Sequence, residues 1–248
     1  MPYVRNGGIR IHYQTEGSGQ VLVLQHGFTD SLGSWYDNGY VDPLKRDCML
    51  VLIDARGHGD SDKPHDVAAY AMEHRVADIV SVINELRVNR VHYFGYSMGG
   101  WIGFGMARHV PERLRSLIVG GADATPRKRE SDPLLTPEMM SKGTAAIPGL
   151  WDAPLPPALR ERVLKNDMEA MRASRVDDPG YEDVLPTIDV PCLLLAGDTD
   201  PIYPTAKAHA AKIPNAKFVT ISGQNHVGTF FRSDLMVSHI KQFLRGIA

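Results

Sequence analysis

The sequence predicts a single α/β domain built around a mostly parallel sheet, on three observations. Mostly apolar stretches of strand length recur along the chain, at residues 21–25, 49–53, 91–94, 114–119, 190–196 and 217–221. Such runs are typical of parallel strands that are covered on both faces. A segment with helical spacing of its apolar residues, at 70–86, predicts a helix that covers the sheet. The length of 248 residues suits one such domain with an inserted segment, and a second independent domain is not expected.

The charge balance and the hydropathy pattern exclude several classes of partner. The chain carries 27 basic and 29 acidic residues and a formal net charge of -2, so no global field favours nucleic acid. Its N-terminal segment lacks a basic start followed by a long apolar stretch, and no apolar run is long enough to cross a bilayer. We therefore expect a small-molecule substrate, no nucleic-acid or membrane partner, and a cytoplasmic location. Nothing in the sequence indicates an oligomeric state.

Cys48 and Cys192 are the only cysteines, and they lie at the edges of two predicted core strands far apart in the chain. A disulfide framework needs more cysteines and a secreted context. We therefore expect two reduced, buried thiols that take no part in catalysis.

Residues 3–5 and 9–13 alternate apolar and polar side chains around Asn6-Gly7-Gly8. This pattern predicts an antiparallel hairpin at the edge of the sheet. His12, in the second half of the hairpin, is expected at the surface.

A tight turn joins an apolar run to a helix at Gly95-Tyr96-Ser97-Met98-Gly99. The small residues at 95 and 99 let the flanking backbone approach closely, so that the Ser97 hydroxyl stands exposed above the sheet edge. The helix that follows directs its free amides and the positive end of its dipole towards the point where a substrate oxygen would become negative. The five residues could arise by chance in a glycine-rich turn, but the strand before them and the helix after them favour a nucleophile elbow.

Polar loops follow two other predicted strands, at the sheet edge where open α/β sheets bind ligands. The first is His26-Gly27-Phe28, in which His26 is expected to brace the loop through hydrogen bonds rather than to react, because a better-placed histidine comes later. The second, residues 54–64, is rich in groups that could suggest a metal site: Asp54, His58, Asp60 and Asp62. Their spacing does not match an EF-hand loop, so we expect a structural loop in which Asp54 could pair with Arg56, and no metal.

The character of the chain changes between residues 123 and 186. Prolines accumulate, charged residues increase, strand signals vanish and helix-like pieces such as 158–174 are short. We expect a cap inserted across the mouth of the site, between the core segments 1–122 and 187–248. A loop region without a role in binding would give the same composition. Trp151 in this insertion is a candidate to contact the substrate, although packing of the cap against the body would explain it equally well.

Together these motifs resemble the α/β-hydrolase fold family, and most closely its group of serine-nucleophile esterases, enol-lactonases and perhydrolases. The resemblance runs from near the start to near the end of the chain. Its motifs are His26-Gly27-Phe28, Asp54-Ala55-Arg56-Gly57-His58-Gly59-Asp60-Ser61-Asp62, the turn around Ser97, Gly197-Asp198-Thr199-Asp200, and His226. It implies an α/β-hydrolase fold with a mostly parallel, eight-stranded sheet, an antiparallel start and a small helical cap.

The resemblance also implies the order serine, acid, histidine along the chain, which differs from the chymotrypsin and subtilisin orders. Ser97 would be the nucleophile and His226 the base. Two aspartates compete for the role of the acid. The family pattern places the acid three residues after the glycine, which selects Asp200 and leaves Asp198 to structure the turn.

The same resemblance assigns the oxyanion hole to the backbone amides of Phe28 and Met98. Ile202 and Val227 follow the predicted acid and base closely, and we expect them to contact the substrate together with Trp151. The rest of the pocket depends on the geometry of the cap. Acyl length, alcohol group and stereochemistry therefore lie beyond what the sequence indicates.

The expected activity is hydrolysis of carboxylic esters or lactones of small to medium size through an acyl-serine, with no metal or organic cofactor. The serine in the elbow argues against haloalkane dehalogenases and epoxide hydrolases of this fold, which attack with an aspartate. Cleavage of carbon–carbon bonds and peracid formation are the alternatives, although Phe28-Thr29-Asp30 replaces the Gly-Pro-Gly loop associated with carbon–carbon hydrolases. A ligand-binding protein without catalysis is the alternative of another class, which the presence of every site residue disfavours.

Overall fold

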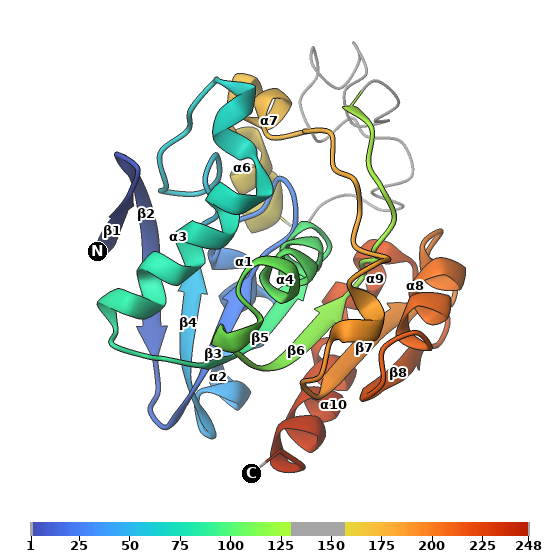
Figure 1. The fold of residues 1–248 in the computed structure, drawn as a ribbon. Helices are drawn as coiled ribbons and strands as arrows, with labels where there is room; N and C mark the ends of the chain where they lie inside the picture. The colour runs from blue at the N-terminus through green and yellow to red at the C-terminus, as the bar shows by residue number, and fades with distance from the viewer. Residues whose placement is uncertain (1, 130–156, 248) are drawn as a thin grey trace.

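A computed structural model describes residues 2–129 and 157–247 of the chain (Figure 1). Among these residues eight strands form one sheet in the order β1-β2-β4-β3-β5-β6-β7-β8. The strands are β1 (Tyr3–Asn6), β2 (Ile9–Glu16), β3 (Gln20–Gln25), β4 (Cys48–Ile53), β5 (Val91–Tyr96), β6 (Leu114–Gly120), β7 (Cys192–Gly197) and β8 (Ala216–Ile221). β1 pairs with β2 and β2 with β4 in antiparallel fashion, and every other pair is parallel. The predicted mostly parallel sheet with an antiparallel start is confirmed.

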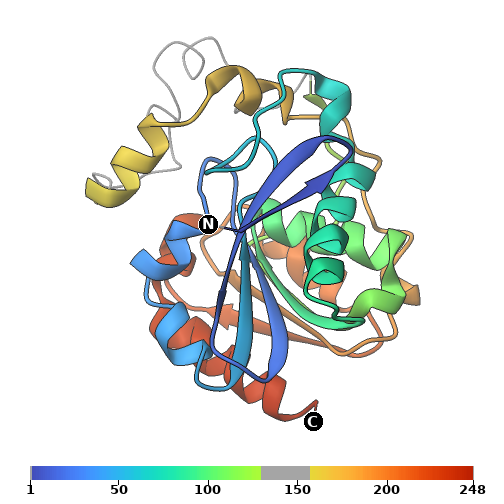
Figure 2. The same cartoon turned by 90° about the vertical axis from the view of Figure 1, so that its left-hand side faces the viewer.

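Helices cover both faces of this sheet (Figures 1 and 2). The described α-helices are α1 (Gly33–Asp37), α2 (Val41–Leu44), α3 (Met72–Glu85), α4 (Met98–His109), α6 (Pro157–Leu164), α7 (Met168–Ala173), α8 (Tyr203–Ala210), α9 (His226–Phe231) and α10 (Ser233–Arg245). Short 3₁₀ turns lie at η1 (Val67–Tyr70), η2 (Pro111–Arg113) and η6 (Leu185–Thr187). No helix in the described ranges is long and apolar enough to cross a membrane.

Successive residues of the buried strands enter two different apolar cores. On β3, Val21 and Val23 pack in the core that also contains residues of α3 and α4, whereas Leu22 and Leu24 pack in the core that contains residues of α2 and α10. Figure 1 shows α3 and α4 in front of the sheet and α10 behind it. Full burial of each such side chain contributes about 1.5–3 kcal/mol. Burial on both faces is the physical reason why the strands read as continuous apolar runs.

The described part of the insertion lies over the carboxyl ends of the strands, where α6 and α7 appear above the sheet in Figure 1. Asn166, between these two helices, donates a hydrogen bond to the carbonyl oxygen of Thr29 at 2.7 Å, and Asp167 contacts His65 at 2.9 Å. The insertion therefore contacts the loops that follow β3 and β4. Its role as a cap stays a prediction, and Trp151 lies outside the described residues.

The expectation that His12 lies at the surface is wrong. β2 extends beyond the hairpin and also pairs with β4, so that it is not an edge strand over its whole length. The His12 residue is 1% exposed, and its Nδ1 lies 2.7 Å from a carboxylate oxygen of Asp54. The alternating pattern of the hairpin gave no signal for this second pairing, because the partner strand lies some forty residues away in the sequence.

Cys48 and Cys192 are free and buried, as predicted. Burial raises the pKa of both thiols, that of Cys192 to about 12. Because the thiolate is the reactive form, neither side chain is a competent nucleophile at neutral pH.

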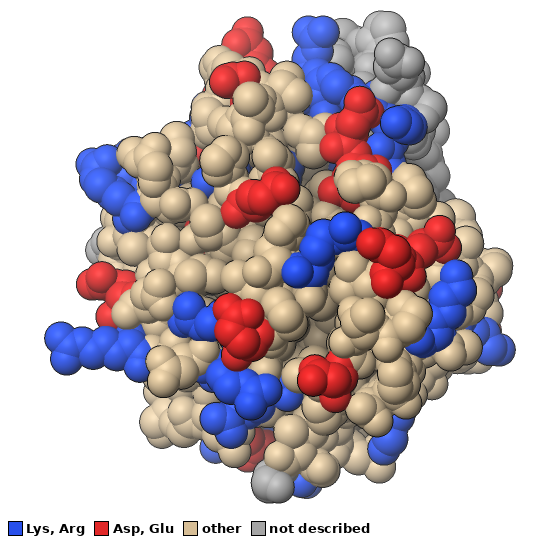
Figure 3. Space-filling model, viewed as in Figure 1, with Lys and Arg blue, Asp and Glu red and all other residues tan. Residues whose placement is uncertain are grey.

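Basic and acidic side chains are interspersed on the face of the molecule shown in Figure 3. Ion pairs between different elements of the molecule include Arg108 with Asp183 and Lys241 with Asp47. Charge of one sign does not dominate this face, in keeping with the net charge of -2.

Candidate active site

Ser97 occupies the turn between β5 and α4 in a conformation that is uncommon for a residue with a side chain. Its φ is 53° and its ψ is -112°. The Ser97 amide donates to the carbonyl oxygen of Gly120 on β6 at 2.8 Å, and its own carbonyl oxygen accepts the amide of Trp101 in the first turn of α4 at 3.0 Å. Backbone strain of this kind persists only where the surroundings hold it, and it is concentrated at functional sites.

Two glycines allow the turn to fit between its neighbours. A Cβ atom on Gly95 would lie 2.1 Å from the carbonyl oxygen of Gly99, and a Cβ atom on Gly99 would lie 2.1 Å from that of Gln25. Both distances are far shorter than a van der Waals contact. The prediction that these two positions require close approach of the backbone is confirmed.

Three side chains from distant parts of the sequence form one hydrogen-bonded chain at the carboxyl ends of the strands. Asp200 follows β7, and His226 begins α9 after β8. His226 Nδ1 donates to Asp200 Oδ2 at 2.7 Å, because a carboxylate can only accept. Nε2 of the neutral imidazole is then an acceptor, and it receives the hydroxyl of Ser97 at 2.9 Å. The Asp200 side chain is 1% exposed and that of His226 is 26% exposed, so the pair is shielded but the histidine remains accessible.

The structure separates the two aspartates that compete for the role of the acid. Besides His226, Asp200 binds the amide of Ile202 through Oδ1 at 3.1 Å, which fixes the orientation of its carboxylate. Asp198 accepts instead from the Ser222 hydroxyl and from the amide of Gly223. Asp198 thus closes the turn after β8, and Asp200 alone of the two contacts the histidine.

The predicted oxyanion loop lies beside the elbow. β3 and β5 are neighbours, and a Cβ atom on Gly27 would lie 3.4 Å from Cβ of Ser97. His26 braces this loop as expected: its Nδ1 donates to the carbonyl oxygen of Gly27 at 2.7 Å, and its Nε2 accepts the amide of Ala55 at 3.1 Å. Phe28 and Met98, whose amides are predicted to bind the oxyanion, therefore belong to two segments that meet at Ser97.

Two buried ionisable side chains contact the residues predicted to supply the oxyanion donors. His58 packs edge-on against the ring of Phe28, and burial lowers its pKa well below the ordinary value, so that its imidazole is neutral at pH 7. Arg75 lies with Nη1 3.6 Å from Sδ of Met98, and burial lowers its pKa to about 10. Arg75 is therefore a buried cation next to one of the two segments predicted to supply oxyanion donors.

A family model of the alpha/beta hydrolase fold matches residues 20–164, more than half of the chain. These residues contain the predicted oxyanion loop and the elbow described above. The chain belongs to the α/β-hydrolase family.

Curated relatives of this α/β-hydrolase include proteins of different activities. A Bacillus subtilis (strain 168) protein named "Putative 2-succinyl-6-hydroxy-2,4-cyclohexadiene-1-carboxylate synthase" is 24% identical over 97% of this chain and 96% of its own length. Bifunctional epoxide hydrolase 2 of Rattus norvegicus is 33% identical over 51% of this chain, and the match spans only 23% of that protein.

Solved structures similar to this α/β-hydrolase share its fold along the whole chain. A thermophilic esterase from Thermogutta terrifontis is 24% identical with a TM-score of 0.81, covering 99% of this chain and 98% of that one. The enol-lactonase from Burkholderia xenovorans LB400 is 20% identical with a TM-score of 0.80, covering 98% and 100%. At these identities the likeness establishes the fold.

Sequence reasoning missed the part that Tyr96 plays in the site of this hydrolase. The Tyr96 hydroxyl donates to the backbone carbonyl oxygen of His226, and the two rings lie 5.7 Å apart. Room for the phenol ring comes from Gly120 and Gly121, where a Cβ atom would lie 2.6 and 2.8 Å from ring atoms of Tyr96. The signal available in the sequence was the glycine pair directly after a core strand.

The residues predicted to contact the substrate of this hydrolase are only partly described. Ile202 is half-buried at the start of α8, and Val227 is half-buried next to His226 in α9. Both therefore adjoin the hydrogen-bonded chain. Trp151 falls outside the described residues, so its contact with the substrate stays a prediction.

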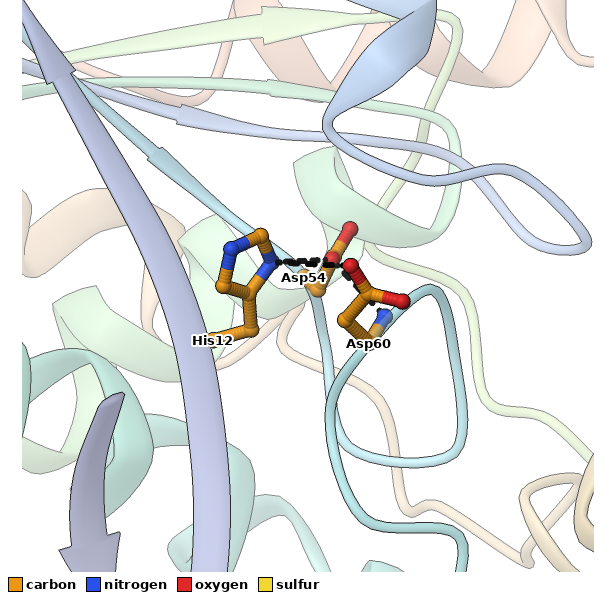
Figure 4. A group of neighbouring side chains, drawn as sticks. All are labelled: His12, Asp54 and Asp60. Carbon is orange, nitrogen blue, oxygen red and sulfur yellow. Dashed lines mark hydrogen bonds and ion pairs between the residues drawn. The ribbon is translucent and has the colours of Figure 1, made fainter. Parts of the chain in front are cut away.

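Within residues 2–129 and 157–247 of this hydrolase, one group of side chains has the composition of a metal site: His12, Asp54 and Asp60 (Figure 4). The oxygens of Asp54 already accept from His12 Nδ1, from the amide of Asp60 and from the amide of Leu32, at 2.7 to 3.0 Å. Nε2 of His12 is on the opposite side of the ring from Asp54 (Figure 4). A metal would have to replace these hydrogen bonds, so the residues do not fit a metal and instead tie β2 to the loop after β4.

The expected pairing of Asp54 with Arg56 is wrong. Arg56 forms a buried bidentate ion pair with Asp78 of α3, at 2.6 Å for both Nε and Nη2. The reason is direction: Asp54 points towards His12 on β2, whereas Arg56 points towards α3. Sequence proximity gave no information about these opposite orientations.

Proposed function

We propose that this α/β-hydrolase cleaves carboxylic esters or lactones of small to medium size through an acyl-serine intermediate. The observation that carries the proposal is the continuous chain of hydrogen bonds from Ser97 through His226 to Asp200, at 2.9 and 2.7 Å. A serine hydroxyl is a weak nucleophile until a neighbouring base accepts its proton. An imidazole oriented by a buried carboxylate is such a base.

In the first half of the reaction, Ser97 Oγ forms a bond to the carbonyl carbon while its proton passes to His226 Nε2. The carbonyl oxygen becomes an alkoxide, which the amides of Phe28 and Met98 stabilise. Loss of one such donor typically raises the barrier by about 2.7–4 kcal/mol. Asp200 stabilises the imidazolium that forms. The alkoxide then collapses, the bond to the leaving oxygen breaks, and His226 donates its proton to that oxygen.

In the second half, His226 accepts a proton from water as the water oxygen attacks the acyl-serine. Collapse of the second alkoxide releases the carboxylic acid and returns the proton to Ser97. With a lactone, the leaving hydroxyl stays attached to the acyl chain. A single hydroxy acid is then released.

Other reactions of the family rest on weaker support. The match to the Rattus norvegicus epoxide hydrolase spans 51% of this chain, and the elbow here carries Ser97 rather than the aspartate expected of such enzymes. Carbon–carbon cleavage and peracid formation would use the same serine and histidine with other substrates. A ligand-binding protein without catalysis would bind an ester without turning it over.

The test is turnover of a chain-length series of nitrophenyl esters and of simple lactones by the purified protein. We expect activity that falls about 10⁴- to 10⁶-fold in both Ser97→Ala and His226→Ala, since residues that act as a unit each remove most of the catalysis. The length optimum then measures the acyl pocket. Wild-type protein that is inert towards every ester and lactone, or variants that match it, would overturn the proposal, and assays with ketones and with hydrogen peroxide would then address the alternatives.

A further inference from the structure

Thr29, directly after the predicted oxyanion donor Phe28, has a strained backbone. Its φ is 68°, in the left-handed region, and the residue is 2% exposed. Positive φ is uncommon for any residue with a side chain and is a clear outlier for a β-branched one. Within the described ranges only Arg87 and Ser97 share this feature among residues other than glycine. Surrounding contacts must hold Thr29 in this conformation.

Side chains from the insertion make two of the contacts that hold it. Nδ2 of Asn166 donates to the carbonyl oxygen of Thr29 at 2.7 Å, and Nη1 of Arg162 donates to Asp30 Oδ1 at 2.7 Å. The Arg162 and Asp30 side chains are 15% and 16% exposed, so their ion pair is screened by water less than a surface pair. Two consecutive residues of the loop are thus held by Arg162 in the last turn of α6 and by Asn166 just after that helix.

Release of Thr29 would disturb the amide of Phe28. Rotation of Thr29 to negative φ turns the peptide group between Phe28 and Thr29. Further along, the loop is fixed where the amide of Leu32 donates to Asp54 Oδ1 at 2.7 Å. The backbone at Gly27 and Phe28 must therefore change its conformation to accommodate the rotation. Because an oxyanion donor acts only when it is already aimed at the developing charge, a small rotation lowers the rate.

We propose that Asn166 and Arg162 are positioning residues that keep the strained oxyanion loop in its active conformation. The inference rests on the proposed function, since it assigns these side chains a part in stabilising the same alkoxide. It implies that docking of α6 on the loop is a condition for turnover and not only for substrate binding.

The first experiment compares kcat and KM of Asn166→Ala and Arg162→Ala with those of the wild type. We expect kcat to fall roughly ten- to a hundredfold with KM changed less than about twofold. Lys165→Ala is the matched control, because Lys165 lies between the two residues in sequence but pairs with Glu161 of α6 at 2.7 Å. It should keep the activity of the wild type.

The second experiment tests the role of strain directly. Glycine adopts positive φ without steric cost. In a Thr29→Gly background, Asn166→Ala and Arg162→Ala should therefore each lower kcat by less than about threefold. A boronic acid that forms a tetrahedral adduct with Ser97 should lose affinity for Asn166→Ala by the same factor as kcat/KM, since it mimics the oxyanion. Neither result is expected from a side chain that only supports the fold.

The outcomes separate this inference from the proposed function. If the wild type hydrolyses esters and both Asn166→Ala and Arg162→Ala retain its kcat, only the inference is overturned. An equal loss of kcat in the Thr29 and Thr29→Gly backgrounds also overturns it. If the wild type and Ser97→Ala are equally inert towards esters and lactones, the proposed function fails and the inference fails with it. If Asn166→Ala does not fold, the inference is decided by the loss of kcat that Arg162→Ala causes in the Thr29 background compared with the Thr29→Gly background.

Discussion

The hydroxyl of Tyr96 donates a hydrogen bond to the backbone carbonyl oxygen of His226, and so joins the residue before the elbow serine to the predicted base. This bond fixes the start of α9 relative to β5. The Tyr96 residue is 4% exposed, so water does not readily replace the hydroxyl. The geometry of the serine and the histidine therefore depends on a side chain outside the hydrogen-bonded chain of Ser97, His226 and Asp200.

We expect Tyr96→Phe to lower kcat roughly five- to tenfold with little change in KM, because loss of one buried hydrogen bond costs about 1–1.5 kcal/mol. Tyr40→Phe is the control. Tyr40 donates to the carbonyl oxygen of Phe230 at the other end of α9, at 2.8 Å. The Tyr40→Phe substitution should lower the midpoint of thermal unfolding and leave kcat nearly unchanged. Equal effects of the two substitutions on kcat would contradict a specific part for Tyr96.

The two aspartates after β7 should differ sharply in function. Asp200→Asn keeps the shape of the side chain but removes the charge that orients and stabilises the His226 imidazolium, and we expect kcat to fall about 10⁴-fold. Asp198→Asn should leave kcat within about threefold of the wild type, because Asp198 binds Ser222 and Gly223 instead. Steady-state kinetics with one nitrophenyl ester measure both variants. A larger loss in Asp198→Asn would reverse the assignment of the acid.

The close approach at the elbow should make Gly99 intolerant of any side chain. A Cβ atom there would lie 2.1 Å from a backbone oxygen, which cannot move without displacing β3. We expect Gly99→Ala to lower the free energy of unfolding by about 1–3 kcal/mol and to abolish turnover. Gly246→Ala, at the end of α10 where the nearest atom is 3.4 Å away, should change stability by less than about 0.5 kcal/mol. Urea denaturation of both variants provides the comparison.

An ion-pair cluster should make the docking of α7 depend on pH. Nε2 of His65 lies 2.9 Å from Asp167, and its Nδ1 lies 2.9 Å from Glu169. Only the imidazolium can donate to both carboxylates, and the hydrogen bond to Asp167 raises the pKa of His65 in the folded state. Its stabilisation is therefore fully present below the unfolded pKa of about 6.5, and is lost as pH rises through the folded value.

Thermal unfolding of the wild type and of His65→Gln between pH 5.5 and about 8.5 measures this effect. The wild type should have the higher midpoint at the acid end, and the difference should vanish at the alkaline end. His74→Gln, at an exposed histidine of α3, is the control and should follow the wild type throughout. If the wild-type midpoint exceeded that of His65→Gln by an amount that grew with pH, the predicted sign of the coupling between His65 protonation and stability would be wrong.

Much of the fold could be predicted because burial is recorded locally in the sequence. The runs at 21–25 and 49–53 do not alternate apolar and polar residues, since each strand is covered on both faces. In the structure they form β3 and β4, whose ends lie within one residue of the predicted ends. The elbow could be predicted for a similar reason. Gly95 satisfies a steric requirement against Gly99, only four positions along the chain, and that requirement leaves a fixed spacing in the sequence.

Errors and omissions arose where a side chain could turn in more than one direction. Asp54 and Arg56 are two residues apart, yet they bind His12 and Asp78 on different elements. The motif fixed their identity but carried no information about their direction.

The sequence by itself determined the mostly parallel sheet, the tight turn at Ser97, and the residues expected to act there. Tertiary structure decided that Asp200 rather than Asp198 contacts His226, that Tyr96 holds the histidine backbone, and that Asn166 reaches Thr29 across 137 positions of the chain. The division has a physical cause. Burial and close packing within one segment select residue types at fixed spacings, whereas a hydrogen bond between distant segments depends on orientations that only the packed fold defines.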